Sequence, residues 1–264
     1  MALITCNHFS YYLGMDMEMC VLLPEKRSRE PQYQQEKKYP VLYLLHGHSD
    51  DHTAYIRKSL IELLVRDQEL IVVMPCAHRS FYTDAKQGHL YYSYITRELP
   101  VVVANFFPAS TKPEDTYIAG ISMGGYGAMK IALNHPEKYR GVGIISGAVI
   151  RQKLEEIGKF ETFTVPDFHE NLRSIFGSGE AELQEMDDLL LMVKKRSAEG
   201  GFQPQLYHCC GTEDKLYSQN TALCDVIQQA AGEWHYTFED GPGDHNWEFW
   251  NEFIPKMLTN LKLI

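Results

Sequence analysis

Short apolar runs recur along the chain, and each is followed by glycine, proline or polar residues. They lie at 41–45, 70–74, 116–121, 141–145 and 206–210. Continuous apolar runs of this length are typical of strands that are buried on both faces in a parallel sheet. Segments with apolar residues at helical spacing separate them, at 60–65, 99–107, 123–133 and 221–231. The alternation of strand-like runs and helical segments predicts an α/β fold with a mostly parallel sheet.

Two parts of the chain depart from this alternation. The first forty residues contain extended segments at 2–9 and 16–23 around a turn at Leu13-Gly14, which predicts an antiparallel edge to the sheet. Between 149 and 204, charged segments with helical spacing replace the alternation. We expect a helical insertion that lies as a cap over the carboxyl ends of the strands, although a helical excursion without that role fits equally well. No linker divides the chain, so a single domain over 1–264 is predicted.

Composition excludes several classes of partner. The 264 residues are 44% hydrophobic and carry a net charge of −10. A phosphate backbone is bound through clustered Lys and Arg, so we expect no nucleic acid partner. No apolar segment approaches the roughly 18 residues that cross a bilayer, and no signal peptide is recognisable, so we expect no membrane partner and a cytoplasmic location. The cysteines lack C-x-x-C spacing and are interpreted as free thiols; they are Cys6, Cys20, Cys76, Cys209, Cys210 and Cys224.

A G-x-S-x-G pattern stands at Gly120-Ile-Ser122-Met-Gly124, directly after an apolar run and directly before a helical segment. A serine at such a sharp turn from strand to helix needs small residues two positions before and after it, so that the two elements can approach. The turn lifts the hydroxyl above the sheet edge, where N–H groups at the start of the helix face any negative charge that forms. Ser122 is therefore the candidate nucleophile. The alternative is a glycine-rich turn with a chance serine.

A serine hydroxyl is a poor nucleophile unless a histidine takes its proton and a carboxylate holds that histidine. In this context the chain order is serine, acid, histidine. Asp214 ends the turn that follows the run at 206–210, and it is preferred as the acid over Glu213. His245 lies 31 residues later in a loop rich in Gly and Pro, and it is the predicted base. The other downstream histidines are predicted to be structural or on the surface: His135, His169, His208 and His235.

A second polar cluster is the stretch LLHGHSDDH at 44–52. Imidazoles two residues apart, followed by carboxylates, suit a hydrolase that binds paired metal ions. The ligands of such a metal-dependent hydrolase would be His46, His48, Asp50 and His52. The spacing is off by one, however, because an additional aspartate precedes the last histidine and turns its imidazole to a different side.

The same stretch has a competing role through its backbone. In hydrolases with a G-x-S-x-G elbow, the loop after the equivalent strand and the residue after the nucleophile each donate one N–H to the oxyanion. This assigns the N–H groups of His48 and Met123 as the oxyanion hole. Gly47 is expected to let the backbone turn tightly under the substrate.

Several further motifs accompany these. The set comprises Leu44-Leu-His-Gly47, Ile71-Val-Val-Met-Pro75, Phe81-Tyr-Thr-Asp84, Gly120-Ile-Ser-Met-Gly-Gly-Tyr-Gly127, Gly211-Thr-Glu-Asp214 and His245-Asn-Trp-Glu-Phe-Trp250. It resembles the tributyrin esterase branch of the esterase D group, which includes S-formylglutathione hydrolases and has feruloyl and acetyl xylan esterases as distant relatives. The resemblance implies an α/β-hydrolase fold, a triad of Ser122, Asp214 and His245, no cofactor, and hydrolysis of esters with short acyl groups.

Two departures narrow the substrate class. S-formylglutathione hydrolases typically have Ser-Gly-Leu-Thr-Cys where this chain has His46-Gly-His-Ser-Asp50, and a histidine where it has Ile121. Both differences favour a serine carboxylesterase that acts on small acetyl-type or aryl esters. S-formylglutathione hydrolase and feruloyl or acetyl xylan esterase activities stay as alternatives, and a non-catalytic binding module is a remote one. Tyr82 and Trp247 are candidate substrate-binding residues, and a homo-oligomer is an open alternative to a monomer.

Overall fold

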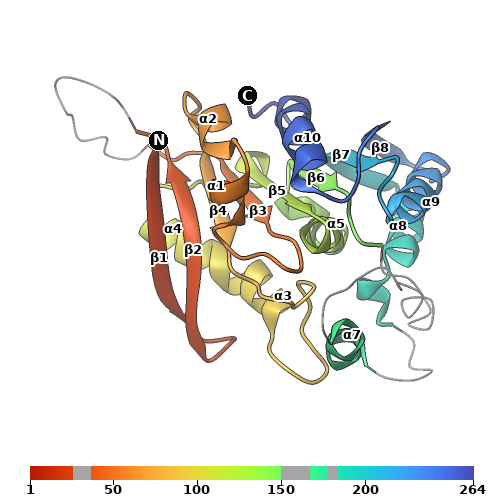
Figure 1. Cartoon of the computed structure of the whole chain (residues 1–264), viewed down its shortest axis with the longest axis horizontal. Helices are drawn as coiled ribbons and strands as arrows, with labels where there is room; N and C mark the ends of the chain where they lie inside the picture. The colour runs from red at the N-terminus through yellow and green to blue at the C-terminus, as the bar shows by residue number, and fades with distance from the viewer. Residues whose placement is uncertain (26–36, 150–166, 178–182) are drawn as a thin grey trace.

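A computed structural model describes residues 1–25, 37–149, 167–177 and 183–264 (Figure 1). Within these residues one sheet forms, with the strand order β1-β2-β4-β3-β5-β6-β7-β8. The strands are β1 (Ala2–Ser10), β2 (Met15–Leu23), β3 (Val41–Leu45), β4 (Ile71–Pro75), β5 (Thr116–Ile121), β6 (Gly141–Ile145), β7 (Gly201–Gly211) and β8 (Glu233–Gly241). The β1–β2 and β2–β4 pairs are antiparallel and the remaining neighbours are parallel. The predicted sheet with its antiparallel N-terminal edge is confirmed.

Helices cover both faces of this sheet (Figure 1). They are α1 (Ala54–Lys58), α2 (Ile61–Val65), α3 (Tyr91–Ser93), α4 (Leu99–Phe106), α5 (Met123–Asn134), α7 (Phe168–Phe176), α8 (Leu189–Ala198), α9 (Tyr217–Gln228) and α10 (Trp247–Asn260). Alternate side chains of a strand point to opposite faces. On β3, Leu42 and Leu44 therefore pack with α1, α2 and α10, whereas Tyr43 and Leu45 pack in the core cluster that contains α4, α5, α8 and α9. No helix in the described ranges is long and apolar enough to cross a membrane.

Burial of both faces of the sheet explains which strands could be recognised from the sequence. Every residue of β3, β4 and β6 is buried, so each of these strands is a continuous apolar run. Strand β8 lies at the edge of the sheet, and its residues are only partly buried or exposed. Its sequence is correspondingly mixed, and no apolar run marks its bounds.

The hairpin of β1 and β2 turns where predicted. Gly14 has a φ of 67°, a left-handed conformation that glycine adopts without steric cost. Its N–H donates to the carbonyl of Ser10 over 2.8 Å. The turn therefore depends on the glycine that marked it in the sequence.

The predicted insertion at 149–204 is described in part, because 150–166 and 178–182 lie outside the described residues. Asp188 caps the start of helix α8, and its carboxylate accepts the N–H groups of Leu190 and Leu191 at 2.9 and 3.0 Å. Just before it, the carbonyl of Asp187 accepts the hydroxyl of Tyr126 at 2.9 Å. The Asp187 carboxylate also lies 2.5 Å from Nζ of Lys130, which is fully buried. The segment before α8 is thereby attached to α5.

Candidate active site

Ser122 occupies the turn between β5 and α5, with φ 54° and ψ −117°. A residue with a Cβ atom rarely adopts a positive φ, so the surrounding structure must impose it. The N–H of Ser122 donates to the carbonyl of Ile145 at 3.0 Å. Its own carbonyl accepts the N–H groups of Tyr126 and Ala148, both at 3.1 Å. Contacts with β6 and with the first turn of α5 thus hold the strained serine at the end of its strand.

Glycines allow strand and helix to cross at this turn. A Cβ atom on Gly120 would lie 2.4 Å from the backbone of Gly124, and one on Gly124 would lie 2.1 Å from the carbonyl oxygen of Leu45. Both distances are shorter than any real contact of a Cβ atom, and backbone atoms cannot move aside as a flexible side chain can. The two small residues of the G-x-S-x-G pattern are therefore required by packing.

We expect Gly124→Ala to lower the free energy of unfolding by about 3 kcal/mol, because β3 and α5 must separate to make room for the methyl group. Urea unfolding followed by circular dichroism measures this change. The matched control is Gly47→Ala, whose added Cβ would meet other atoms only at 3.5 Å or more. Equal stability of Gly124→Ala and the parent would contradict the packing argument.

Ser122, His245 and Asp214 come together at the carboxyl ends of the strands. The Nε2 atom of His245 lies 2.9 Å from Oγ of Ser122, and its Nδ1 atom lies 2.8 Å from Oδ2 of Asp214. Both Ser122 and Asp214 are buried. If Nδ1–H donates to the carboxylate, Nε2 is left as the acceptor for the serine hydroxyl proton. The arrangement can therefore pass one proton from serine to imidazole.

The charge of Asp214 follows from its surroundings. Burial by itself raises the pKa of this carboxyl, but the hydrogen bond and the positive charge of His245 lower it, with smaller contributions from the N–H of Leu216 and the hydroxyl of Ser146. The net shift of the pKa is downward. The carboxylate is therefore ionised at neutral pH, as the orientation of a histidine base requires.

The loops that carry the acid and the histidine touch each other through their backbones. The N–H of Thr212 donates to the carbonyl of Gly241 at 2.8 Å, and that of Glu213 donates to the carbonyl of Gly243 at 3.0 Å. A Cβ atom on Gly211 would lie 2.1 Å from the oxygen of Gly243, so the close approach depends on glycine. Glu213, the alternative acid in the sequence, is exposed.

The ring of His245 is oriented by the helix that follows it. Trp250 of α10 packs edge-on against the imidazole, with ring centroids 5.1 Å apart. Helix α10 begins after Asn246, whose side-chain oxygen accepts the N–H of Phe249 at 3.0 Å. Asn246 is thus a capping residue that sets the direction of α10. Ring packing and helix cap together restrict how the base can turn.

The two residues predicted to supply N–H groups to the oxyanion are Met123, which follows Ser122 in the chain, and His48, which follows Gly47. In the part of the chain that the structure describes, neither the N–H of Met123 nor that of His48 donates to a protein acceptor. Gly47 has no positive φ, so the expected tight turn is not the reason for this glycine. A Cβ atom there would lie 3.6 Å from the Cβ of Ser122. The glycine instead keeps space open beside the nucleophile.

The imidazole of His46 orients the peptide that links Gly47 to His48. Its Nε2 atom accepts the N–H of Ala77 at 2.9 Å, so the proton of the neutral ring is on Nδ1, which donates to the carbonyl of Gly47 at 2.7 Å. The N–H of Asp50 donates to the same carbonyl at 3.1 Å. The C=O and N–H of a trans peptide point in opposite directions. Because the carbonyl of Gly47 is held by these two donors, the N–H of His48 must point to the opposite side of the same peptide.

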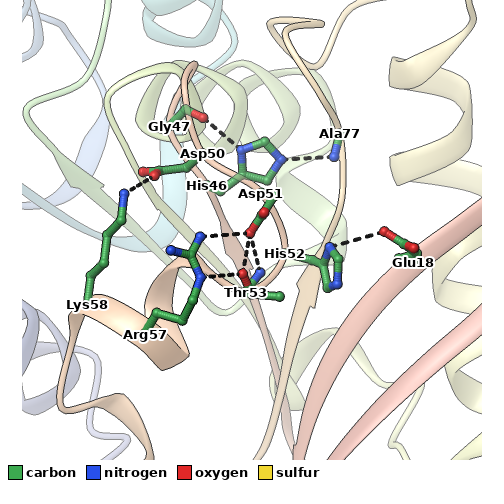
Figure 2. Close-up of polar contacts among 10 residues, drawn as sticks. All are labelled: Glu18, His46, Gly47, Asp50, Asp51, His52, Thr53, Arg57, Lys58 and Ala77. Atoms are coloured by element: carbon green, nitrogen blue, oxygen red, sulfur yellow. Dashed lines mark hydrogen bonds and ion pairs between the residues drawn. The ribbon is translucent and has the colours of Figure 1, made fainter.

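The side chains of LLHGHSDDH diverge, as Figure 2 shows for His46, Asp50, Asp51 and His52. Three of the four predicted metal ligands have their own polar partner: the N–H of Ala77 for His46, Asn171 for His48 and Lys58 for Asp50. The fourth, His52, points toward Glu18, whose carboxylate lies 3.6 Å from its Nδ1 atom. Nowhere among the described residues do three His, Cys, Asp or Glu side chains gather as a metal ion would need. The geometry of these four side chains therefore does not support the metal site that the spacing suggested.

The two candidate substrate-binding residues have different surroundings. Tyr82 is fully buried, and its hydroxyl donates to the carbonyl of His46 at 3.0 Å. Since its ring has no exposed surface, the prediction that Tyr82 contacts substrate is wrong for this structure, and Tyr82 supports the loop that carries His48 instead. Trp247 is partly exposed at the start of α10 and packs against Tyr55. Its contact with substrate stays a prediction.

Some supporting residues were not identified from the sequence. The side-chain nitrogen of Asn220 donates to the carbonyls of Gly147 and Leu216 at 2.9 and 2.8 Å, which joins the loop after β6 to the loop after Asp214. The Oδ1 atom of Asn220 lies 2.8 Å from Nε2 of the buried His208. The sign of this network in the sequence was His208 inside the apolar run at 206–210, because a buried imidazole needs polar partners.

Comparison with known proteins gives one consistent result. A family model described as "Putative esterase" matches residues 10–261. The chain is 27% identical over 258 residues to an acetyl esterase of Caldicellulosiruptor saccharolyticus, with 96% of each chain covered. Among solved structures it is similar to the substrate-bound fluorophosphonate-binding serine hydrolase FphF of Staphylococcus aureus, at 33% identity and a TM-score of 0.85 over 98% of each chain. It is also similar to the S-formylglutathione hydrolase FrmB of the same organism, at 34% identity and a TM-score of 0.80, again over 98% of each chain. The predicted α/β-hydrolase fold is confirmed.

Proposed function

The chain belongs to this esterase family and is a serine esterase, and we propose that it hydrolyses esters of short acyl groups through an acyl-enzyme on Ser122. The observation that carries the proposal is the pair of contacts made by His245, at 2.9 Å to Ser122 and at 2.8 Å to Asp214. A hydroxyl, an imidazole and a buried carboxylate in this order are what acyl transfer through serine requires. The alternative of a non-catalytic binding module is set aside, since the relatives are esterases.

In the first half of the reaction, the hydroxyl oxygen of Ser122 attacks the ester carbonyl while Nε2 of His245 accepts its proton. Asp214 holds the imidazole and stabilises the positive charge that it acquires. The N–H groups of His48 and Met123 donate to the oxyanion of the tetrahedral intermediate. When the intermediate collapses, His245 gives the proton to the departing alcohol, and the acyl group stays on Ser122.

In the second half, water takes the place of the alcohol. His245 accepts a proton from the water, whose oxygen attacks the acyl carbonyl and forms a second oxyanion in the same position. Collapse then releases the carboxylic acid and returns the proton to Ser122. Both halves use the same two N–H donors, so a fault in the oxyanion hole slows acylation and deacylation alike.

The acyl group that we propose is acetyl or another short chain. The acetyl esterase relative supports this choice. The likeness to FrmB favours S-formylglutathione hydrolysis as a second candidate, against which stand the sequence departures at 46–50 and at Ile121. A small ester is thus the proposed partner. A cytoplasmic location is proposed as well, supported by the six unpaired cysteine thiols.

A substrate series distinguishes the two candidates. We expect kcat/KM to be at least about tenfold higher for p-nitrophenyl acetate and butyrate than for the octanoate, because a pocket that fits a short chain rejects added methylenes. A feruloyl ester and S-formylglutathione complete the series, with purified protein and initial rates by absorbance. A kcat/KM for S-formylglutathione above that for every oxygen ester would replace the proposal with the second candidate.

A further inference from the structure

Helix α7 contacts the oxyanion loop through the ring of His48. The Nε2 atom of His48 lies 3.0 Å from Oδ1 of Asn171, which is 123 residues further along the chain. The same ring packs edge-on against Phe168, with centroids 5.1 Å apart, and lies 5.5 Å from the ring of Phe81. Only 6% of His48 is exposed. One face of α7 therefore closes over the side chain of His48, whose backbone N–H is a proposed oxyanion donor.

We propose that Asn171 is a positioning residue for the oxyanion hole and acts through the ring of His48, which makes α7 a part of the active site. The inference rests on the proposed function, because it takes the N–H of His48 as an oxyanion donor. It gives the predicted insertion at 149–204 a role in catalysis, in place of the alternative of a helical excursion without such a role.

The His48 ring is neutral and suited to an amide partner. Burial lowers its pKa to about 4, and the positive charge of Arg79 acts in the same direction, while the Asn171 hydrogen bond opposes them. A neutral ring has one N–H and one lone pair. The Nε–H of Arg79 also donates to Nε2 of His48 at 3.2 Å, which puts the proton of the neutral ring on Nδ1. An amide can meet either tautomer, accepting through its oxygen or donating through its nitrogen, whereas leucine of similar size can do neither.

The peptide before His48 is held from both sides. On one side, the imidazole of His46 donates to the carbonyl of Gly47, as described above. On the other side, Asn171, Phe168 and Phe81 hold the ring that is attached to the Cα atom of His48. An N–H donor contributes to catalysis only if it points at the developing charge in advance. Loss of either support therefore lets this N–H turn away.

The second proposed donor depends on the same contacts. The N–H of Phe81 donates to the sulfur of Met123 at 3.3 Å. The ring of Phe81 packs against Phe168 and Phe176, near the two ends of α7, with centroids 6.3 and 6.0 Å apart. Phe81 itself has a φ of 49°, a conformation that packing must maintain. A shift of α7 thus reaches the side chains of both oxyanion residues.

The test is a double-mutant cycle with Asn171→Leu and His48→Phe, in the full chain, with p-nitrophenyl acetate. His48→Phe keeps an aromatic ring, slightly larger than imidazole, between its aromatic neighbours and removes the polar atoms. We expect each change to lower kcat/KM about tenfold, a fraction of the hundredfold or greater loss when an oxyanion donor is removed. The loss should fall on kcat, with KM within about twofold, because the contact acts on the transition state. The double variant should be no slower than the slower single one, since both break one link.

Controls separate positioning from general damage. Glu170→Gln changes the exposed neighbour of Asn171 on the same helix and should leave kcat/KM unchanged. His48→Gln, which returns a polar atom near the position of Nε2, should recover part of the loss seen in His48→Phe. Urea unfolding of each variant shows that the fold is kept.

The inference is overturned if Asn171→Leu matches the parent, if only KM changes, or if the two losses multiply in the double variant. Ser122→Ala in the same assay separates this result from a failure of the proposed function. If Ser122→Ala is inactive and Asn171→Leu is fully active, only the proposed role of α7 is refuted. An active Ser122→Ala would remove the function on which that role depends.

Discussion

Replacing Ser122 with alanine lowers kcat/KM for p-nitrophenyl acetate by about ten-thousandfold or more, because no other group in the proposed mechanism forms the acyl-enzyme. The hydroxyl is 2.9 Å from Nε2 of His245 and lies at the turn between β5 and α5. Alanine has a Cβ atom like serine, so the strained backbone is no worse, and the free energy of unfolding stays within about 1 kcal/mol. Initial rates and urea unfolding measure the two quantities.

A fluorophosphonate probe gives the same prediction a second readout. The parent should acquire one adduct on the peptide that contains Ser122, located by mass spectrometry, and Ser122→Ala should acquire none. Heat-unfolded parent is the control, because a serine without its histidine base reacts slowly with the probe. Activity of Ser122→Ala within a few-fold of the parent would refute the assignment of the nucleophile.

Asp214→Asn should lower kcat about a thousandfold to ten-thousandfold without loss of folding. A carboxylate can only accept the proton on Nδ1 of His245, at 2.8 Å, and so leaves Nε2 free to act as the base. An amide can donate to Nδ1 instead, which puts the imidazole proton on Nε2, the atom that must accept the proton of Ser122. The variant therefore tests the tautomer of the histidine, with the shape of the site preserved.

The matched control for Asp214→Asn is Glu213→Gln. Glu213 is the adjacent residue, it is the other acid that the sequence allows, and it is exposed, whereas Asp214 is buried. We expect kcat of Glu213→Gln within about twofold of the parent, as for most exposed substitutions. The reverse result, a large loss with Glu213→Gln and little with Asp214→Asn, would exchange the two roles.

Local sequence was sufficient where a physical requirement acts on neighbouring residues. Strands β3, β4 and β6 are continuous apolar runs because both of their faces are covered. The G-x-S-x-G pattern is informative because Gly120 and Gly124 meet backbone atoms at distances that admit no side chain. The order of serine, acid and histidine could be read because each follows a strand, and the carboxyl ends of parallel strands share one edge of the sheet.

Side-chain direction was beyond the reach of the sequence. The spacing of LLHGHSDDH was compatible with a metal site, and the structure instead sends its side chains to α1, β2 and the loop after β4 (Figure 2). The side chain of His48 contacts α7. Tyr82 was placed near the substrate by its motif, yet its ring is buried and its hydroxyl supports the carbonyl of His46. In both cases the partner that decides the role is distant in the sequence.

The sequence by itself determined the fold class, the esterase family and the three residues that lie in hydrogen-bond contact at the candidate site. The fold class and the three residues rest on burial, close backbone packing and chain order, which leave a pattern in neighbouring residues, and the family rests on the resemblance of the motifs to those of known esterases. Only the tertiary structure decided the fate of the 44–52 stretch, the support of its peptide by His46, and the contact of His48 with Asn171 across 123 residues. Those features depend on where a side chain points after the sheet and its helices have packed, and residue spacing does not encode that direction.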